Sequence, residues 1–137
     1  MNKVSPLNTT EYETLWPGGQ IAVPIFEPAR RPAKLDGLTV AFVWDYVFRG
    51  DDIFPILQEA LTKAYPTMTF VSYDRFGNIF GGDEHGVRAH LPELLLASGV
   101  DVVITGVGCC GAFTPAVMRA SAAIERAGVP TASLVCQ

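Results

Sequence analysis

The chain has 137 residues, of which 49% are hydrophobic and 18% are charged, and its formal net charge is -4. This length suits one ordinary domain, and the composition is too apolar for a disordered chain. The acidic balance without a Lys/Arg cluster excludes sequence-independent nucleic-acid binding, and the lack of an apolar run of about 20 residues excludes a membrane span.

The N-terminal part of the chain differs from the rest in composition. Its first twenty residues contain no continuous apolar segment, so they predict neither a signal peptide nor an anchor, and we expect the protein in the cytoplasm. Residues 1–36 are rich in proline and polar turn formers, with one short extended run at 21–26. We expect 1–36 to form an extended arm that packs on the domain or on a neighbour, and 37–137 to form a single α/β domain.

Strands and helices alternate along the remainder. Apolar runs rich in β-formers predict four strands, over 38–44, 68–73, 100–105 and 130–136. Apolar residues at helical spacing predict three helices between them. Their start and stop residues are Asp51 or Asp52 with Pro66, Glu84 with Gly99, and Thr114 with Gly128. This order predicts a three-layer βαβ sandwich on a parallel four-stranded sheet, either flavodoxin-like or like one half of an aspartate/glutamate racemase.

A Gly-Val-Gly-Cys-Cys-Gly segment at 106–111 joins the third strand to the third helix. Ligands of open parallel sheets bind outside the carboxyl ends of the strands, where we expect this loop. Glycines let a backbone approach a ligand closely or take positive φ. Gly106, Gly108 and Gly111 are therefore candidate substrate-binding positions.

Cys110 is the candidate nucleophile of this loop. It precedes the predicted N-cap Thr114 by four residues, and a thiol near a helix N-terminus is favoured as the thiolate. Adjacent cysteines seldom reach disulfide geometry, so we expect Cys109 and Cys110 to be reduced. The alternative is that both are buried packing residues, as free cysteines usually are, and we predict that role for Cys136 inside the last strand.

Other polar residues are candidates for the same site. Asp45 ends the first strand, and Arg49 follows it closely; the alternative for Asp45 is a turn or capping carboxylate. His85 is a candidate general base if its loop folds over the strand ends, and otherwise a surface histidine.

No metal and no cofactor is predicted. The histidines near residues 83–90 match no recognised zinc spacing. The glycines at 106–111 match the dinucleotide fingerprint formally, but Pro115 places the helix start too late and no acid ends the next strand. A small-anion site formed by the loop amides remains an alternative.

The segment from Asp101 to Thr114, followed by a helix and Glu125-Arg-Ala-Gly-Val-Pro-Thr131, resembles the UGSC family of bacterial proteins and selenoproteins. The family signature is similar to Gly-x-Gly-Asp-(Sec or Cys)-Gly-Ser-Cys-Thr, then a helix and Leu-Glu-x-x-Gly-x-Pro-Thr. The segment 35–41 also resembles the family's first strand, so the resemblance covers roughly 35–137.

The resemblance assigns positions residue by residue. It places Cys110 at the selenocysteine-or-cysteine position, with Gly111 and Thr114 at the glycine and threonine. Cys109 stands where the family has aspartate, Ala112 where it has serine, and Phe113 where it has its second cysteine. The resemblance therefore implies thiol chemistry at Cys110 without the CxxC-like redox partner.

We expect a cysteine-dependent enzyme or enzyme subunit, in which Cys110 acts on a small electrophilic metabolite and Cys109 and Thr114 assist. A likeness to the racemase group, which carries cysteines at strand ends, fits proton transfer or addition. The alternatives are a non-catalytic subunit of a hetero-oligomeric complex and a thiol redox protein. A final strand with no covering helix leaves an edge that soluble proteins seldom leave bare, and the chain looks shortened relative to the family. Both features predict a homo-oligomer or a second subunit that completes the fold.

Overall fold

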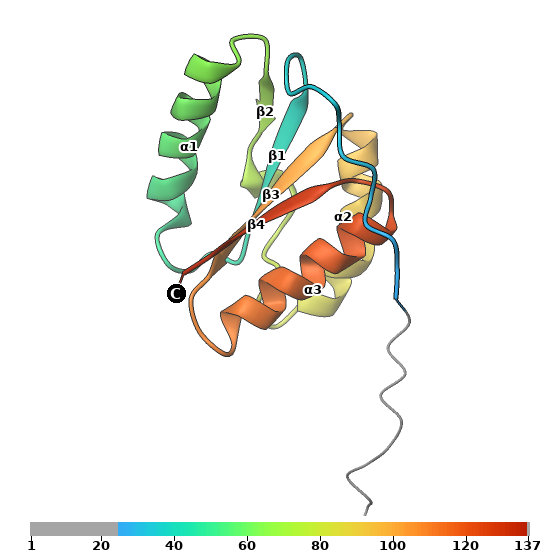
Figure 1. The fold of residues 1–137 in the computed structure, drawn as a ribbon. Coiled ribbons are helices and arrows are strands. Elements are labelled where there is room, and N and C mark those ends of the chain that lie inside the picture. The colour runs from blue at the N-terminus through green and yellow to red at the C-terminus, as the bar shows by residue number, and fades with distance from the viewer. Residues whose placement is uncertain (1–24, 137) are drawn as a thin grey trace, which may run out of the picture.

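The computed structural model describes residues 25–136. Three helices and four strands alternate along it (Figure 1). The elements are β1 (Thr39–Trp44), α1 (Gly50–Ala64), β2 (Thr69–Val71), η1 (Tyr73–Arg75), α2 (Glu84–Ala97), β3 (Val102–Gly108), α3 (Phe113–Arg126) and β4 (Thr131–Val135). No helix in this part of the chain has the length and apolar character that crossing a membrane requires.

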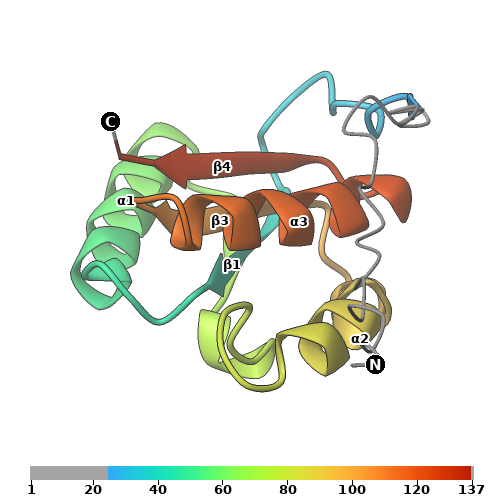
Figure 2. The same cartoon turned by 90° about the horizontal axis from the view of Figure 1, so that it is seen from below.

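The strands form one parallel sheet in the order β2-β1-β3-β4. The helix α1 covers one face, and α2 and α3 cover the other (Figure 2). The predicted α/β architecture with a parallel four-stranded sheet is therefore confirmed. The same order begins doubly wound sheets, in which β1 and β3 border the crevice where the winding direction reverses. The finer division into flavodoxin-like and racemase-like classes stays a prediction.

Two hydrophobic clusters hold these layers together, and β1 contributes to both. Phe42 and Trp44 pack with Phe54 of α1, whereas Val43 packs on the other face with residues of α2 and α3 such as Leu91. Successive side chains of a strand point to opposite faces, so a strand buried on both faces reads as a continuous apolar run. This explains why β1 was recognisable from the sequence.

The third strand is longer than predicted. It runs to Gly108, because Gly106 pairs with Trp44 of β1 and Gly108 pairs with Val135 of β4. Gly106 and Gly108 are thus strand residues, and only the segment after Gly108 is a loop. The helix α3 begins at Phe113 with Ala112 as N-cap, so the predicted N-cap role of Thr114 is wrong.

The start of α1 also differs from the prediction. Its N-cap is Arg49, in a left-handed conformation and without a side-chain capping bond. Asp51 and Asp52 lie inside the first turn, so neither is the predicted cap. Asp52 pairs instead with Arg49 at 2.6 Å. The other predicted ends are closer: α2 and α3 each finish just before a glycine of positive φ, Gly99 and Gly128.

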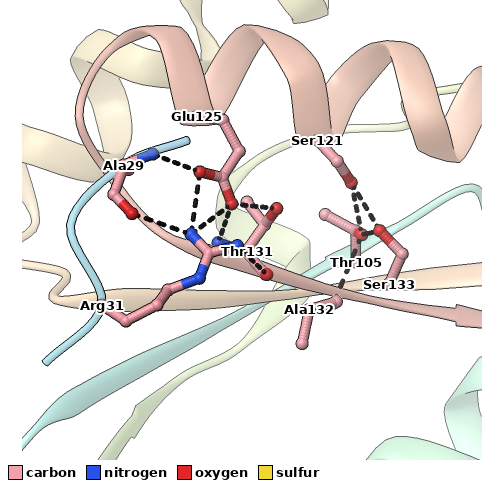
Figure 3. A network of polar contacts seen from close by, with 8 residues as sticks. All are labelled: Ala29, Arg31, Thr105, Ser121, Glu125, Thr131, Ala132 and Ser133. Carbon is pink, nitrogen blue, oxygen red and sulfur yellow. Dashed lines mark hydrogen bonds and ion pairs between the residues drawn. The ribbon is translucent and has the colours of Figure 1, made fainter. Parts of the chain in front are cut away.

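The described part of the predicted arm, residues 25–36, carries no strand or helix and lies along α3 and β4. Ala29 is buried, and its amide donates to Glu125 Oε2 at 2.7 Å. Arg31 Nη1 and the Thr131 amide each donate to Glu125 Oε1 at 2.7 Å (Figure 3). Glu125 therefore ties this segment to the turn that leads into β4. Residues 21–24 of the predicted extended run lie outside the described residues.

Candidate functional site

Four reactive or ionisable side chains follow the carboxyl ends of three strands. Asp45 comes directly after β1, Cys109 and Cys110 come directly after β3, and Cys136 comes directly after β4. Parallel strands bring these ends to one edge of the sheet, beside the turns that lead into α1 and α3 (Figure 1). We call Cys109, Cys110 and Cys136 the thiol cluster. It lies where open parallel sheets bind their ligands.

Cys110 is exposed and stands just before α3. The Ala112 amide donates to its Sγ at 3.4 Å. Hydrogen bonds from the Phe113 and Ala112 amides lower the pKa of the Cys110 thiol, and a bond from the Cys109 side chain acts in the same direction. These donors are the unpaired amides of a helix N-terminus, so Cys110 is favoured as the thiolate, the nucleophilic form of cysteine.

Cys109 has the opposite character. It is half-buried, and burial raises the pKa of its thiol. The neighbouring Cys110, Asp45 and Cys136 raise that pKa further by charge repulsion. Cys109 therefore stays protonated while Cys110 ionises, and it donates its proton in the hydrogen bond between them. The neighbouring thiols thus differ in chemistry, which the sequence alone does not reveal.

Cys136 corrects a prediction. It is exposed, and not a core residue of the last strand, because β4 ends at Val135. Its amide donates to the Gly108 carbonyl oxygen at 2.6 Å, which continues the β3–β4 pairing by one hydrogen bond. This bond places Cys136 beside the first residue of the cysteine pair.

Asp45 is the only charged residue of the described chain that is completely buried, with 0% of its surface exposed. Its Oδ1 accepts a hydrogen bond from the Val107 amide at 2.9 Å. Its Oδ2 has no hydrogen-bond partner within residues 25–136. Burial raises the pKa of Asp45, and nearby backbone amides, that of Val107 foremost, offset this only in part. A buried polar atom without a partner costs about 1 to 3 kcal/mol and calls for a functional or structural explanation.

The turn after Asp45 is strained. Tyr46, Phe48 and Arg49 have φ values of 58°, 57° and 56°, in the left-handed region that bulky residues rarely enter. Such residues cost roughly 1 to 3 kcal/mol each and cluster at functional sites. The Trp44 ring stabilises the turn, since its Nε1 donates to the Val47 carbonyl at 2.9 Å and the ring stacks on Tyr46 at 4.7 Å. No turn signal in Tyr-Val-Phe-Arg indicated this feature, so sequence reasoning missed it.

Two predicted site residues are not brought to the thiol cluster by any contact of the described chain. Arg49 is exposed and forms its ion pair with Asp52. His85 is exposed in the first turn of α2, where its Nδ1 lies 2.7 Å from Arg88 Nη2. A general-base role for His85 and a substrate contact for Arg49 therefore stay predictions that need a ligand-bound state.

The three glycines and Thr114 shape the backbone around the cluster. A Cβ on Gly108 would lie 2.9 Å from Thr114 Cα, and one on Gly106 would lie 3.2 Å from Leu134 Cβ. A Cβ on Gly111 would meet nothing within 4 Å. The Thr114 amide donates to the Cys110 carbonyl at 3.1 Å. Gly106 and Gly108 thus permit close packing, and their predicted substrate contacts remain untested.

No group of three or more His, Cys, Asp or Glu side chains between residues 25 and 136 is placed to hold a metal ion. A cavity of about 470 Å³ lies elsewhere, between the arm and α3, with Phe26, Arg31 and Ser133 among its lining residues. None of the site residues predicted from the sequence lines that cavity.

Comparison with known proteins identifies a family for this chain. No curated protein and no solved structure matches the chain. A sequence model of the UGSC family matches residues 13–137, which include the whole sheet, the cysteine pair and the segment from Glu125 to Thr131. Because this match covers nearly the full length, the chain belongs to the UGSC family.

Proposed function

We propose that this protein is a cysteine-dependent enzyme, or the cysteine-bearing subunit of one, that acts on a small electrophilic metabolite through the Cys110 thiolate. One observation supports the proposal above all. Cys110 is an exposed thiol whose sulfur accepts hydrogen bonds from the first amides of α3, and these lower its pKa. A thiolate stabilised in this way resembles the activated nucleophiles of covalent catalysis.

The neighbouring groups support complementary roles. Attack by Cys110 forms a bond from sulfur to the electrophilic atom and moves an electron pair onto the substrate. Cys109, whose thiol is held protonated by burial, is the proposed proton donor to that developing charge. The amides of Ala112 and Phe113, with Thr114 in the first turn, are the proposed stabilisers of an anionic intermediate.

Thiol alkylation tests the nucleophile. The native protein is titrated with iodoacetamide across pH, and labelled positions are mapped by mass spectrometry. We expect Cys110 to label faster than Cys109 and Cys136, with an apparent pKa below the usual value of about 8.5. Equal rates at Cys110 and Cys136, both exposed, would show that the helix N-terminus does not activate Cys110. Once a substrate is found, unchanged turnover in Cys110→Ala would sink the enzymatic proposal.

A second candidate function, a non-catalytic subunit of a larger assembly, is favoured by β4. This strand lies at the edge of the described sheet, and its residues Thr-Ala-Ser-Leu-Val include no charge and no proline. Edge strands without such residues tend to pair with another chain. The proposed partner is a second copy or another subunit, and the three free cysteines suit a reducing cytoplasm. Light scattering on the native protein tests pairing of two copies, which a monomer at all concentrations would contradict.

A further inference from the structure

The positions of Cys109 and Cys136 suggest chemistry beyond attack by Cys110. The two residues follow paired positions of neighbouring strands, because Gly108 of β3 pairs with Val135 of β4. The Cys136 amide nitrogen lies 2.6 Å from the carbonyl oxygen of Gly108, the residue bonded to Cys109. Neighbouring strands are about 5 Å apart, and disulfides join α-carbons about 4.4 to 6.8 Å apart. The backbone thus places these two cysteines within disulfide reach.

Accessibility and electrostatics agree with this placement. Cys136 is exposed and Cys109 is half-buried, so a small oxidant reaches the pair from solvent. Negative charge on Cys110 or Cys136 raises the pKa of Cys109, which agrees with the placement that the backbone gives these residues. By contrast, Phe113, at the family position of the second cysteine, packs its ring against Phe80 at 4.6 Å. The only other thiol available to the cysteine pair within the described chain is therefore that of Cys136.

We propose that Cys109 and Cys136 form a reversible disulfide, and that Cys110 transfers oxidising equivalents to this pair from a low-molecular-weight disulfide. The proposal goes beyond the proposed function, since it needs no metabolite. It shares with that function only the first step, attack by the Cys110 thiolate.

The reaction has three exchange steps. The Cys110 thiolate attacks a small disulfide, which forms a mixed disulfide and releases one small thiolate. The Cys109 thiol loses its proton to that thiolate and attacks the Cys110 sulfur, which releases the second small thiolate and leaves a strained bond between adjacent cysteines. The Cys136 thiolate, its proton given to the second small thiolate, then attacks the Cys109 sulfur and releases Cys110 as a thiolate.

The balance of these steps is one small disulfide reduced to two thiols and two protein thiols oxidised to one disulfide. The last step is favoured because a thiol of lowered pKa is the better leaving group, and Cys110 has that character. It also relieves the strain of the bond between neighbours. The stable product is a disulfide between Cys109 and Cys136, with Cys110 again free as the thiolate.

Disulfide mapping tests this assignment. The full chain is incubated with bis(2-hydroxyethyl) disulfide, quenched with N-ethylmaleimide, digested and sequenced by tandem mass spectrometry. We expect a loss of two hydrogens from the intact mass before quenching, a cross-linked Cys109–Cys136 peptide, and N-ethylmaleimide on Cys110. In Cys136→Ser we expect the mixed disulfide to accumulate on Cys110, because the strained Cys109–Cys110 bond is reopened by the released small thiolate and no third thiol removes it.

Two outcomes would overturn the proposal. One is Cys136 recovered with N-ethylmaleimide while Cys110 or Cys109 is oxidised. The other is a cross-link that forms only after unfolding in urea.

The Cys110→Ser variant separates this proposal from the proposed function. There we expect the same cross-link to form more slowly, by about three- to fourfold for each pKa unit between Cys110 and the thiol that replaces it in the first attack, because the loss of thiolate is partly offset by the higher nucleophilicity of a thiolate of higher pKa. A cross-link in wild type with ordinary alkylation rates at Cys110 would support the disulfide and contradict the activated nucleophile.

Discussion

Two buried or partly buried carboxylates of this domain have opposite surroundings. Glu125, near the end of α3, accepts hydrogen bonds from the Ala29 amide, the Arg31 guanidinium, and both the amide and hydroxyl of Thr131. Burial opposes ionisation of Glu125, but these donors outweigh it and lower its pKa to about 2. Within residues 25–136, Asp45 accepts one hydrogen bond of good geometry, from the Val107 amide; its second oxygen has no partner there, and its pKa is raised. Among the described residues, both oxygens of the Glu125 carboxylate therefore have hydrogen-bond donors, whereas the Asp45 carboxylate beside the thiol cluster has one oxygen without a donor.

Three hydroxyl groups in the interior between these two carboxylates all have hydrogen-bond partners. The hydroxyls of Thr105, Ser121 and Ser133 form a closed triangle with oxygen separations of 2.7, 2.8 and 3.0 Å (Figure 3). A buried polar network is stable when every member has a partner. Because the other buried polar side chains between residues 25 and 136 have partners, the unpaired oxygen of Asp45 is a local exception. It coincides with the strained turn at 46–49 and with the thiol cluster, which supports a functional role for that edge.

Removing the charge of Glu125 should have the largest effect on stability. In Glu125→Gln the new amide group faces the donors of Arg31 and Thr131, so we expect the free energy of unfolding to fall by about 2 kcal/mol at neutral pH. The lowered pKa means that this stabilisation is present above the ordinary value of 4.5 and is lost as pH falls toward about 2. Urea unfolding from pH 7 to pH 2 measures both.

An exposed glutamate provides the matched control for this variant. Glu59 pairs with Lys63 on the surface of α1, with 68% of its side chain exposed. Surface pairs contribute little, so Glu59→Gln should change stability by less than about 0.5 kcal/mol. If Glu125→Gln and wild type lost stability in parallel between pH 4.5 and pH 2, the Glu125 network would not be the source of acid sensitivity.

Substitution of the glycines beside the thiol cluster should have an intermediate effect on stability. In Gly108→Ala the new methyl group would lie 2.9 Å from Thr114 Cα, and helix backbone cannot move away as a flexible side chain can. We expect a loss of about 1 to 3 kcal/mol in urea unfolding and slower alkylation of Cys110, because the first turn of α3 must shift. Gly111→Ala is the control, since its methyl group enters open space and should change stability by less than about 0.5 kcal/mol. Equal losses in both variants would show that the segment tolerates no side chain for another reason.

The sequence predicted the fold well because the fold depends on regular patterns. Apolar runs and helical spacing identified the four strands and the three α-helices but not the short helix η1, and glycines after α2 and α3 marked the ends of those helices. The errors lie at the ends of elements, which depend on residues that are distant in the sequence. The strand β3 continues through Gly106 and Gly108 because β1 and β4 pair with them. The helix α1 has no Asp cap because the strained turn before it places Arg49 at the N-cap position.

The site was predictable only in outline. The positions of Cys110 and Asp45 at strand ends followed from topology, but their chemistry depends on atoms that are distant in sequence. The unpaired oxygen of Asp45 reflects how β3 passes it, and the proximity of Cys136 to Cys109 reflects strand register. Cys136 was assigned to the core because its apolar neighbours suggested a longer strand. No local sequence pattern shows which residues of other strands lie beside Asp45 and Cys136.

Replacing Asp45 should have the smallest effect on the fold and the most specific effect on the thiols. Because its pKa is raised above the ordinary 3.8, Asp45 contributes its stability below that value and loses it as pH rises through the folded pKa. The stability of Asp45→Asn relative to wild type should therefore increase as pH rises above the ordinary value of 3.8. The variant also removes a charge that raises the pKa of Cys109 and Cys110, so both should alkylate at lower pH.

Asp101→Asn is the control, because Asp101 is an exposed carboxylate that accepts a hydrogen bond from the Thr39 amide at 2.8 Å near the opposite ends of the strands. If Asp45→Asn left the alkylation profiles of both thiols unchanged while the pH dependence of stability disappeared, the buried carboxylate would act on the fold alone and the thiol cluster would be independent of it.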